Sequence, residues 1–404
     1  MKNMEPREVS KQVARRFLVL RQRFLQGRRG KDGTLEAIRR LECVQKDPIN
    51  VVRRNHQLVL HNRVVDYKPS YLDELLYRDR QLFEYWCNAK SIIPAEDLPY
   101  FRYRMQNPSQ FHSPFYERIK GKRKDLKAEI VHILSEIRKH GPLSAREFEE
   151  KGKTRGKAAT RVLNLLWDCG DLMIHHVDGN RRYYDLTERV LPPNEEAKSP
   201  SQEEYERFMI QKYMRAYGFV DTRNWRFGWL SLKASQRKTV VKEMVEEDKL
   251  YPIKVEGVKH VYYVLDEHLS LLENYDTPAS GKIHFLAPLD NLLWNRQMIS
   301  EIFDFTYTWE VYKAPEKRTY GYYAMPILYG TRLIGRLDPK LDRPNKTMII
   351  NSLFLEEKDY DKTFISELVE TMQRFLEFHD SSQISIIRTM PEELKNALMR
   401  ELTS

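Results

Sequence analysis

Gln45 and Asp47 are the two residues whose types and spacing in this sequence suggest chemistry. In an extended chain, residues two positions apart project to the same side, so an amide and a carboxylate would face one small volume. Such a pair can hold a water molecule beside a cation-like transition state. The competing interpretation is that Asp47, which precedes Pro48, is only a turn or helix-capping residue.

The distribution of charge indicates a polyanionic partner. The chain has 404 residues and a formal net charge of +10. Residues 1–160 hold 35 Lys and Arg against 20 Asp and Glu, whereas the remainder holds 33 against 38. A basic segment attracts polyanions, of which nucleic acid is the commonest. A basic surface that only keeps the protein soluble is the alternative.

Cysteine usage and hydropathy indicate a reduced, non-membrane environment. Cys43, Cys87 and Cys169 show no paired spacing, which argues against a disulfide framework or a CxxC metal site. The N-terminus lacks the apolar core of a signal peptide. No apolar run approaches the roughly 20 residues that a membrane span needs. We expect a cytoplasmic protein that uses neither a cofactor nor a metal.

The elements around the Gln45/Asp47 segment resemble a helix-turn-helix in pattern. Apolar spacing predicts helices over residues 8–25 and 34–42, followed by a short extended stretch at 45–47. Pro48 ends that stretch, and residues 50–65 suit a third, basic helix. Two helices, a break and a basic helix are typical of DNA-binding units.

Residues 124–192 repeat this arrangement more clearly. Gly141-Pro142 ends a first helix, and Ser144 with Glu147 forms a capping box for the next. A third helix precedes two strands within 172–184 that are joined by an Asp-Gly turn. Three helices and a hairpin predict a winged helix.

A third unit follows at a constant offset of 78 positions. Leu172, Gly179 and Tyr184 then correspond to Leu250, Gly257 and Tyr262. This offset predicts a second tandem winged helix over residues 202–268. A polar linker at 192–200 separates the two.

The last part of the chain has a different residue pattern. Residues 283–355 contain short aromatic and β-branched runs with turn signals at 329–330 and 343–345, which predicts a β-domain, and 360–378 return to helical spacing. The predicted fold class is therefore α+β, mainly α, with tandem winged-helix units followed by a small C-terminal β-domain. The predicted domains are a catalytic N-terminal unit (1–118), two winged helices (119–193 and 200–275) and a β-domain with a C-terminal helix (280–404).

The chemistry that suits this pair on DNA is hydrolysis of an N-glycosidic bond. That reaction passes through an oxocarbenium-like sugar. A purine alkylated on N7 already carries positive charge and leaves as a neutral base, so it needs no general acid. One carboxylate to stabilise the sugar cation and activate water, and one amide to hold that water, would suffice. No lysine has an evident Schiff-base role, which favours a monofunctional enzyme.

Several segments together resemble the YcaQ-like (AlkX/AlkZ-type) winged-helix DNA glycosylase family. They are CVQKDPINVVRRNH (43–56), LVLHNR (58–63), FEYW (83–86), LAPLDNLLW (286–294), RTYGYY (318–323) and GRLDPK (335–340). The resemblance implies tandem winged helices, a C-terminal β-domain and excision of bulky alkylated purines, in some members with unhooking of interstrand crosslinks. It places the family's catalytic pair at Gln45 and Asp47, of the QxD type that resembles the branch with broader substrates. Lys46 departs from the usual apolar middle residue.

The expected DNA contacts come from basic residues near this segment, in the linker cluster and at the hairpin tip. They are Arg53, Arg54, His56, Arg63, Lys122, Arg123, Lys124, Arg181 and Arg182. For Arg63 a structural role is the equal alternative, and His56 is more ordinarily a part-buried helix residue. The cluster at 120–127 can equally be a solvated linker, and the hairpin tip an ordinary turn.

Other conspicuous side chains receive structural interpretations. His175 and His176, adjacent in a strand, should point to opposite faces and so form no common metal site. Trp86, Trp167 and Trp294 are expected in the core.

The sequence thus predicts a monomeric, nucleoid-associated glycosylase acting on double-stranded DNA with alkylated or crosslinked purines. The alternative is a non-catalytic winged-helix transcriptional regulator, which should prefer one DNA sequence and dimerise on a palindrome. A nuclease is less suited, because no carboxylate cluster fits two metals.

Overall fold

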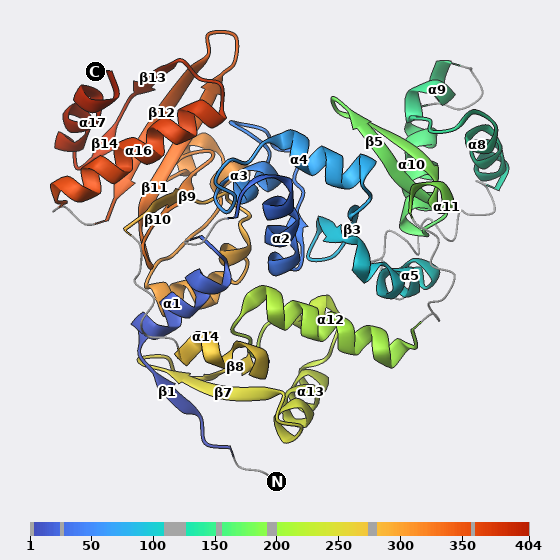
Figure 1. Cartoon of the computed structure of the whole chain (residues 1–404), viewed down its shortest axis with the longest axis horizontal. Helices are drawn as coiled ribbons and strands as arrows, with labels where there is room; N and C mark the ends of the chain where they lie inside the picture. The colour runs from blue at the N-terminus through green and yellow to red at the C-terminus, as the bar shows by residue number, and fades with distance from the viewer. Residues whose placement is uncertain are drawn as a thin grey trace. The chain divides into compact units, whose positions relative to one another are not determined.

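The structure is a computed structural model that describes residues 4–24, 28–108, 127–150, 156–191, 200–273, 281–356 and 360–403. The chain forms two compact units. Unit 1 contains residues 1–68, 214–225 and 233–404, and unit 2 contains 69–213 and 226–232. Unit 1 therefore combines parts of the first, third and fourth predicted domains. Helices and sheets are mixed throughout, as Figure 1 shows.

Unit 1 begins with the elements that lead to the Gln45/Asp47 segment. They are β1 (Arg7–Val9), α1 (Lys11–Arg21), α2 (Gly30–Leu41), β2 (Val44–Gln45) and α3 (Asn55–His61). The first helix begins later than predicted because Ser10 is its N-cap and accepts a hydrogen bond from Val13 N at 3.2 Å. The third helix is shorter than predicted, since residues 46–54 form an irregular segment between β2 and α3.

The predicted hairpin over 250–265 belongs to unit 1. The hairpin consists of β7 (Leu250–Val255) and β8 (Val261–Leu265). The helices α13 (Ala234–Glu246) and α14 (Leu269–Glu273) precede and follow it. β7 pairs antiparallel with β8 and parallel with β1. Gly257 at its turn has a φ of 71°, and Gly179 at the turn of the other hairpin has 57°, so the offset of 78 positions joins equivalent places.

The rest of unit 1 is the predicted β-domain. A six-stranded sheet contains β9 (Ile283–Phe285), β10 (Met325–Tyr329), β11 (Arg332–Asp342), β12 (Thr347–Leu355), β13 (Gln383–Ile386) and β14 (Thr389–Met390). α15 (Arg296–Phe303), α16 (Lys362–Phe378) and α17 (Glu393–Thr403) complete it. α16 lies against the sheet (Figure 1). The ring centre of Phe375 on this helix lies 5.4 Å from that of Phe285 on β9. Residues 320–324, which lie within the stretch predicted to hold short strands, form a loop before β10.

One hydrophobic core joins these parts of unit 1. Phe17 and Leu18 of α1, Ile253 and Tyr262 of the β7–β8 hairpin, and Leu292 are each almost fully buried in it. The N-terminal elements and the β-domain thus share one close-packed interior.

Unit 2 contains two antiparallel hairpins and several helices. Its elements are α4 (Pro69–Asp73), a short π-helix (Glu74–Arg78), β3 (Leu82–Trp86), β4 (Lys90–Pro94), α5 (Leu98–Gln106), α8 (Lys127–His140), α9 (Ala145–Glu150), α10 (Gly156–Asp168), β5 (Leu172–Asp178), β6 (Arg181–Leu186), α11 (Thr187–Val190) and most of α12 (Gln202–Tyr217). Ser144 and Glu147 form the predicted capping contact before α9, with Ser144 N donating to Glu147 at 2.9 Å. None of the described helices is both long and apolar enough to cross a bilayer.

Candidate active site

The site begins where β2 leaves the core. Val44 is fully buried, whereas Gln45, Lys46 and Asp47 are each half-buried. The strand ends at Gln45, so Asp47 lies in the irregular segment that follows. Lys46 does not enter the core in place of the apolar residue that the resemblance implied there. Its half-buried position fits a long side chain whose charged end reaches water.

Two asparagines hold the backbone of this strand. Asn55 Nδ2 donates to the carbonyl of Gln45 at 3.1 Å, and its Oδ1 accepts from Leu289 N at 3.0 Å. Asn291 Nδ2 donates to the carbonyl of Cys43 at 2.8 Å. Both amides are buried, at 2% and 3% exposure, so each bond lies away from competing water. The segment 286–294 therefore fixes the strand through its carbonyls and leaves the side chains of Gln45 and Asp47 outside these contacts.

Asp47 is a carboxylate in a partly desolvated place. Burial raises the pKa of Asp47 above its usual range, and a hydrogen bond of 2.9 Å from Ile49 N opposes that shift. Tyr323 of the β-domain lies near enough that the charge of Asp47 adds to the raised pKa of this phenol, which burial and Tyr307 mainly cause. A carboxylate that lacks full hydration is a stronger base and a better partner for a developing sugar cation.

The segment after Asp47 is also tied to the β-domain. Arg343, in the β11–β12 turn, donates through Nη2 to the carbonyls of Asn50 and Val52, at 3.1 and 2.9 Å. Leu341 N donates to the carbonyl of Val51 at 3.4 Å, and the side chain of Val52 is buried. The irregular segment 46–54 is therefore bonded to the β-domain at residues 50–52, and sequence reasoning assigned no role to Arg343.

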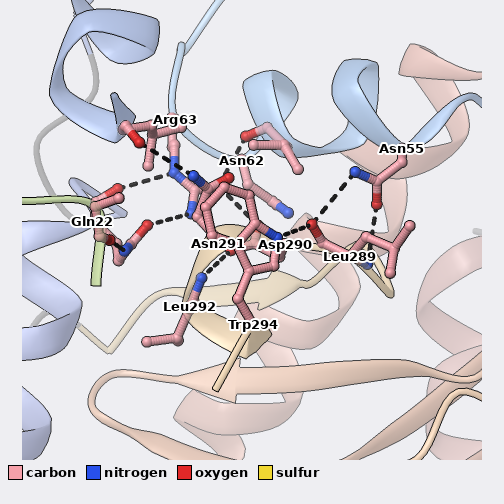
Figure 2. A network of polar contacts seen from close by, with 12 residues as sticks. Gln22, Asn55, Asn62, Arg63, Leu289, Asp290, Asn291, Leu292 and Trp294 are labelled. Atoms are coloured by element: carbon pink, nitrogen blue, oxygen red, sulfur yellow. Dashed lines mark hydrogen bonds and ion pairs between the residues drawn. The ribbon is translucent and has the colours of Figure 1, made fainter. Parts of the chain in front are cut away.

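Arg63 lies in the interior, which corrects the expectation of a phosphate contact. Its side chain and that of Asp290 are both 0% exposed, and they form a two-pronged ion pair with distances of 2.8 and 2.8 Å (Figure 2). Arg63 also donates to the carbonyls of Gln22 and Val59 at 2.9 Å, and its guanidinium stacks on Phe24. With its donors occupied inside the protein, Arg63 ties α3 to α1 and to the 286–294 segment.

Of the other basic residues near the site, one is buried and two are partly exposed. His56 is 4% exposed, so it too is unsuited to direct DNA contact, as the part-buried interpretation had it. Arg54 is half-buried. Arg53 is 24% exposed at its side chain and pairs with Asp380 at 2.8 Å. Arg53 and Arg54 thus keep their place as expected DNA contacts on the same segment as Asp47.

The remaining predicted contacts belong to unit 2 or lie outside the described residues. Arg181 is exposed and Arg182 half-buried at the start of β6, beside the turn of the β5–β6 hairpin. Lys122, Arg123 and Lys124 lie outside the described residues, as does most of the linker at 192–200.

His175 and His176 do not point to opposite faces. Their Nδ1 atoms lie 2.8 Å apart, and their rings meet edge to face. The pairing of β5 with β6 shifts between Ile174 and His176, and such a bulge turns two neighbouring side chains to one side. Across the described part of the chain, no three His, Cys, Asp or Glu side chains gather in a way that could hold a metal ion.

The tryptophans have structural contacts. Of the three expected in the core, Trp167 is buried, whereas Trp86 and Trp294 are half-buried. Trp86 Nε1 donates to Asp168 at 2.8 Å, and Trp294 Nε1 donates to the carbonyl of Leu289 at 3.0 Å. Sequence reasoning placed 286–294 among the segments of resemblance but missed that Asp290 and Asn291 organise the site. An Asp-Asn pair within an apolar run was the available signal, because buried polar side chains need partners.

Comparison with known proteins defines the class of this molecule. A family model described as "DNA glycosylase AlkZ-like" matches residues 38–378, which include β2, the 286–294 segment and most of the β-domain. A solved structure, the DNA glycosylase AlkZ of Streptomyces sahachiroi, has a similar fold, with a TM-score of 0.64 and 17% identity over 94% of this chain and all of that one. The protein is thus a DNA glycosylase, an enzyme of DNA repair. More particularly, it belongs to the AlkZ-like DNA glycosylase family.

Proposed function

We propose that this enzyme removes cationic N7-alkylated purines from double-stranded DNA through Gln45 and Asp47. Asp47 stabilises the sugar cation and activates water, and Gln45 orients that water. The observation that supports the proposal is the way in which the backbone of this strand is held by hydrogen bonds. Its carbonyls are bonded to Asn55 and Asn291, whereas the Gln45 and Asp47 side chains are only half-buried and Asp47 has a raised pKa.

The reaction needs no general acid, because the leaving base carries its positive charge before the bond breaks. Water displaces the base at the sugar carbon, Asp47 takes the proton, and a neutral purine and an abasic site result. The same step on each arm of a crosslink formed through N7 would unhook it, so interstrand crosslinks belong to the proposed substrates.

DNA binding is assigned in the same proposal to helix-and-hairpin units of the winged-helix kind. The order of α8, α9, α10 and the β5–β6 hairpin supports this for one unit, with Arg181 and Arg182 near the hairpin tip. Arg53 and Arg54 supply contacts beside the site. The proposed enzyme acts as a monomer, since one lesion needs one catalytic pair.

The test uses a labelled duplex with a single N7-methylguanine, incubated in EDTA with the wild-type protein or with Asp47→Asn. Hot alkali then cleaves any abasic site. We expect cleavage with the wild type and a loss of roughly 10²–10³-fold with Asp47→Asn, while both proteins bind the duplex equally. Wild-type excision by Asp47→Asn on every adduct tested would refute the assignment.

Borohydride trapping tests the monofunctional mechanism. Lys46 is the lysine next to Asp47, and a Schiff base at its amine would give a covalent DNA adduct on reduction. We expect no adduct, and Lys46→Gln should retain excision. An adduct that Lys46→Gln abolishes would show a lyase instead. Tight binding to one undamaged sequence without any excision would point to a regulator.

A further inference from the structure

A basic pocket of about 280 Å³ lies in unit 1, beside the segment that follows Asp47. Residues 50–57 form one wall, and the β11–β12 turn with the residues after α16 forms the other. Its polar lining includes Asn50, Arg53, Gln57, Arg343, Lys346 and Asp380. Three of these are cations and one is an acid, so the pocket carries a net positive charge.

The cations keep donors that the protein does not use. Arg53 donates through Nε to the carbonyl of Phe378 and through Nη2 to Asp380, both at 2.8 Å. All hydrogen bonds of the Arg343 guanidinium run through Nη2. Within the described part of the chain, Arg53 Nη1, Arg343 Nε and Nη1, and Lys346 Nζ have no hydrogen-bond partner. Four donor nitrogens without a protein partner in one pocket suit an anion with several oxygens.

The other titratable groups of the lining do little to change the positive charge of the pocket. His379, a buried lining residue, has its pKa lowered to about 3, mainly by burial and also by the charges of Arg53, His61 and Arg343, against a bond to the Phe375 carbonyl. This imidazole stays neutral and adds no charge. The one acid, Asp380, is 82% exposed at its side chain, so its pairing with Arg53 is weakened by water.

The pocket lies within reach of the catalytic carboxylate. Asn50 is three residues from Asp47, so their Cα atoms are separated by at most about 11 Å. Phosphates along one DNA strand advance by roughly 3.4 Å per nucleotide. A phosphate in the pocket would therefore lie about one to three nucleotides from a base at Asp47.

We propose that Arg53, Arg343 and Lys346 form a pocket for one backbone phosphate of the damaged duplex, near the lesion. Gln57 adds an amide to it. This rests on the proposed function of Gln45 and Asp47, and it deepens it. Because Arg343 also bonds the carbonyls of Asn50 and Val52, the bound phosphate would fix the segment that carries Asp47. The pocket thus sets the register of the DNA against the catalytic pair.

The experiment replaces single phosphates by neutral methylphosphonates, one at a time, within four nucleotides of N7-methylguanine on each strand. Binding is measured with Asp47→Asn, which leaves the lesion intact. We expect one position where the neutral linkage weakens binding about threefold to tenfold. At that position Lys346→Gln should add little, whereas elsewhere it should weaken binding by a similar factor. Lys346→Gln should also lower the salt dependence of binding by about one ion.

Two further variants complete the test. Asp380→Asn should tighten binding to the normal duplex, because it removes the competing acid. Lys362→Gln, which removes an equal charge from an exposed site at the start of α16, should leave the methylphosphonate profile unchanged. Lys346 is exposed and its Nζ forms no hydrogen bond or ion pair with the described residues, so its replacement should not unfold the protein.

The outcomes separate this proposal from the one it rests on. A flat profile, or losses that add fully with Lys346→Gln at every position, would overturn the pocket even if the wild type excises N7-methylguanine. A single sensitive position without excision by the wild type would keep the pocket and overturn the catalytic assignment. Weakening by inorganic phosphate beyond that of chloride at equal ionic strength, with a flat profile, would identify a free-anion site and also overturn the proposal.

Discussion

Replacing Arg63 should lower the free energy of unfolding of the enzyme, because this residue supports the fold and does not contact DNA. In Arg63→Met, Asp290 keeps its carboxylate in a place with no exposure and loses both contacts of 2.8 Å. Removing one partner of a buried ion pair costs about 3–5 kcal/mol in free energy of unfolding, because the other charge stays buried without compensation. The loss is at the upper end here, since the bonds to the Gln22 and Val59 carbonyls disappear as well.

The matched control is Arg53→Met, ten positions earlier in the same segment. Its ion pair with the exposed Asp380 should contribute no more than about 1 kcal/mol. Urea unfolding followed by circular dichroism measures stability, and fluorescence anisotropy at two salt concentrations measures DNA binding. We expect Arg63→Met to lower the free energy of unfolding, while the folded protein binds DNA with an unchanged salt dependence. Arg53→Met should keep its stability and show a weaker salt dependence of DNA binding.

A double variant separates burial from lost contacts. Arg63→Met/Asp290→Leu removes both charges, so it should be less destabilised than the sum of the single changes by roughly 1–3 kcal/mol. The reasoning fails if Arg63→Met unfolds within about 0.5 kcal/mol of the wild type while its DNA affinity falls. That result would return Arg63 to the set of phosphate contacts.

Three other outcomes follow from the site. Asn55→Ala should lower excision while DNA binding persists. It should also lower the free energy of unfolding in urea by about 1–3 kcal/mol, because the Gln45 carbonyl and Leu289 N lose a buried partner. An unchanged rate of excision would show that Asn55 does not position the strand. Excision should fall as the pH drops through the raised pKa of Asp47, so the acid limb of a pH–rate profile should lie above the ordinary aspartate value of about 3.9, and Asp47→Asn should lack that limb. Gly321→Ala should destabilise the 318–323 loop, since its φ is 133° and a Cβ there would lie 2.2 Å from Asp338 Oδ2; a thermal melt that matches the wild type would contradict this.

The sequence predicted elements better than it predicted polar interiors. Apolar spacing located α1, α2, the β5–β6 and β7–β8 hairpins and α16, because these elements bury one face and repeat it. It overextended the third helix, since the carbonyls of Asn50, Val51 and Val52 are bonded by Arg343 and Leu341, which lie far away in the sequence. Local propensity has no access to such bonds.

The same limit explains the site residues. Gln45 and Asp47 stood out by type and spacing, and the resemblance gave them a role. Arg63 has the sequence context of a DNA contact. Its structural role becomes visible only through its partner Asp290, which lies 227 positions later in the chain. The side-by-side placement of His175 and His176 depends on a bulge in strand pairing, which alternation alone does not reveal.

The asparagine anchors have a consequence for how this enzyme can be altered. Asn55 and Asn291 bond the carbonyls of Gln45 and Cys43, and every amino acid offers the same carbonyl. Neither of these two bonds therefore depends on which side chain stands at position 45, whereas the Asp47 carboxylate itself accepts a bond from Ile49 N. Gln45 can therefore be exchanged without removing the bonds that hold the strand, so variants at this position can test substrate preference while the surrounding protein stays the same.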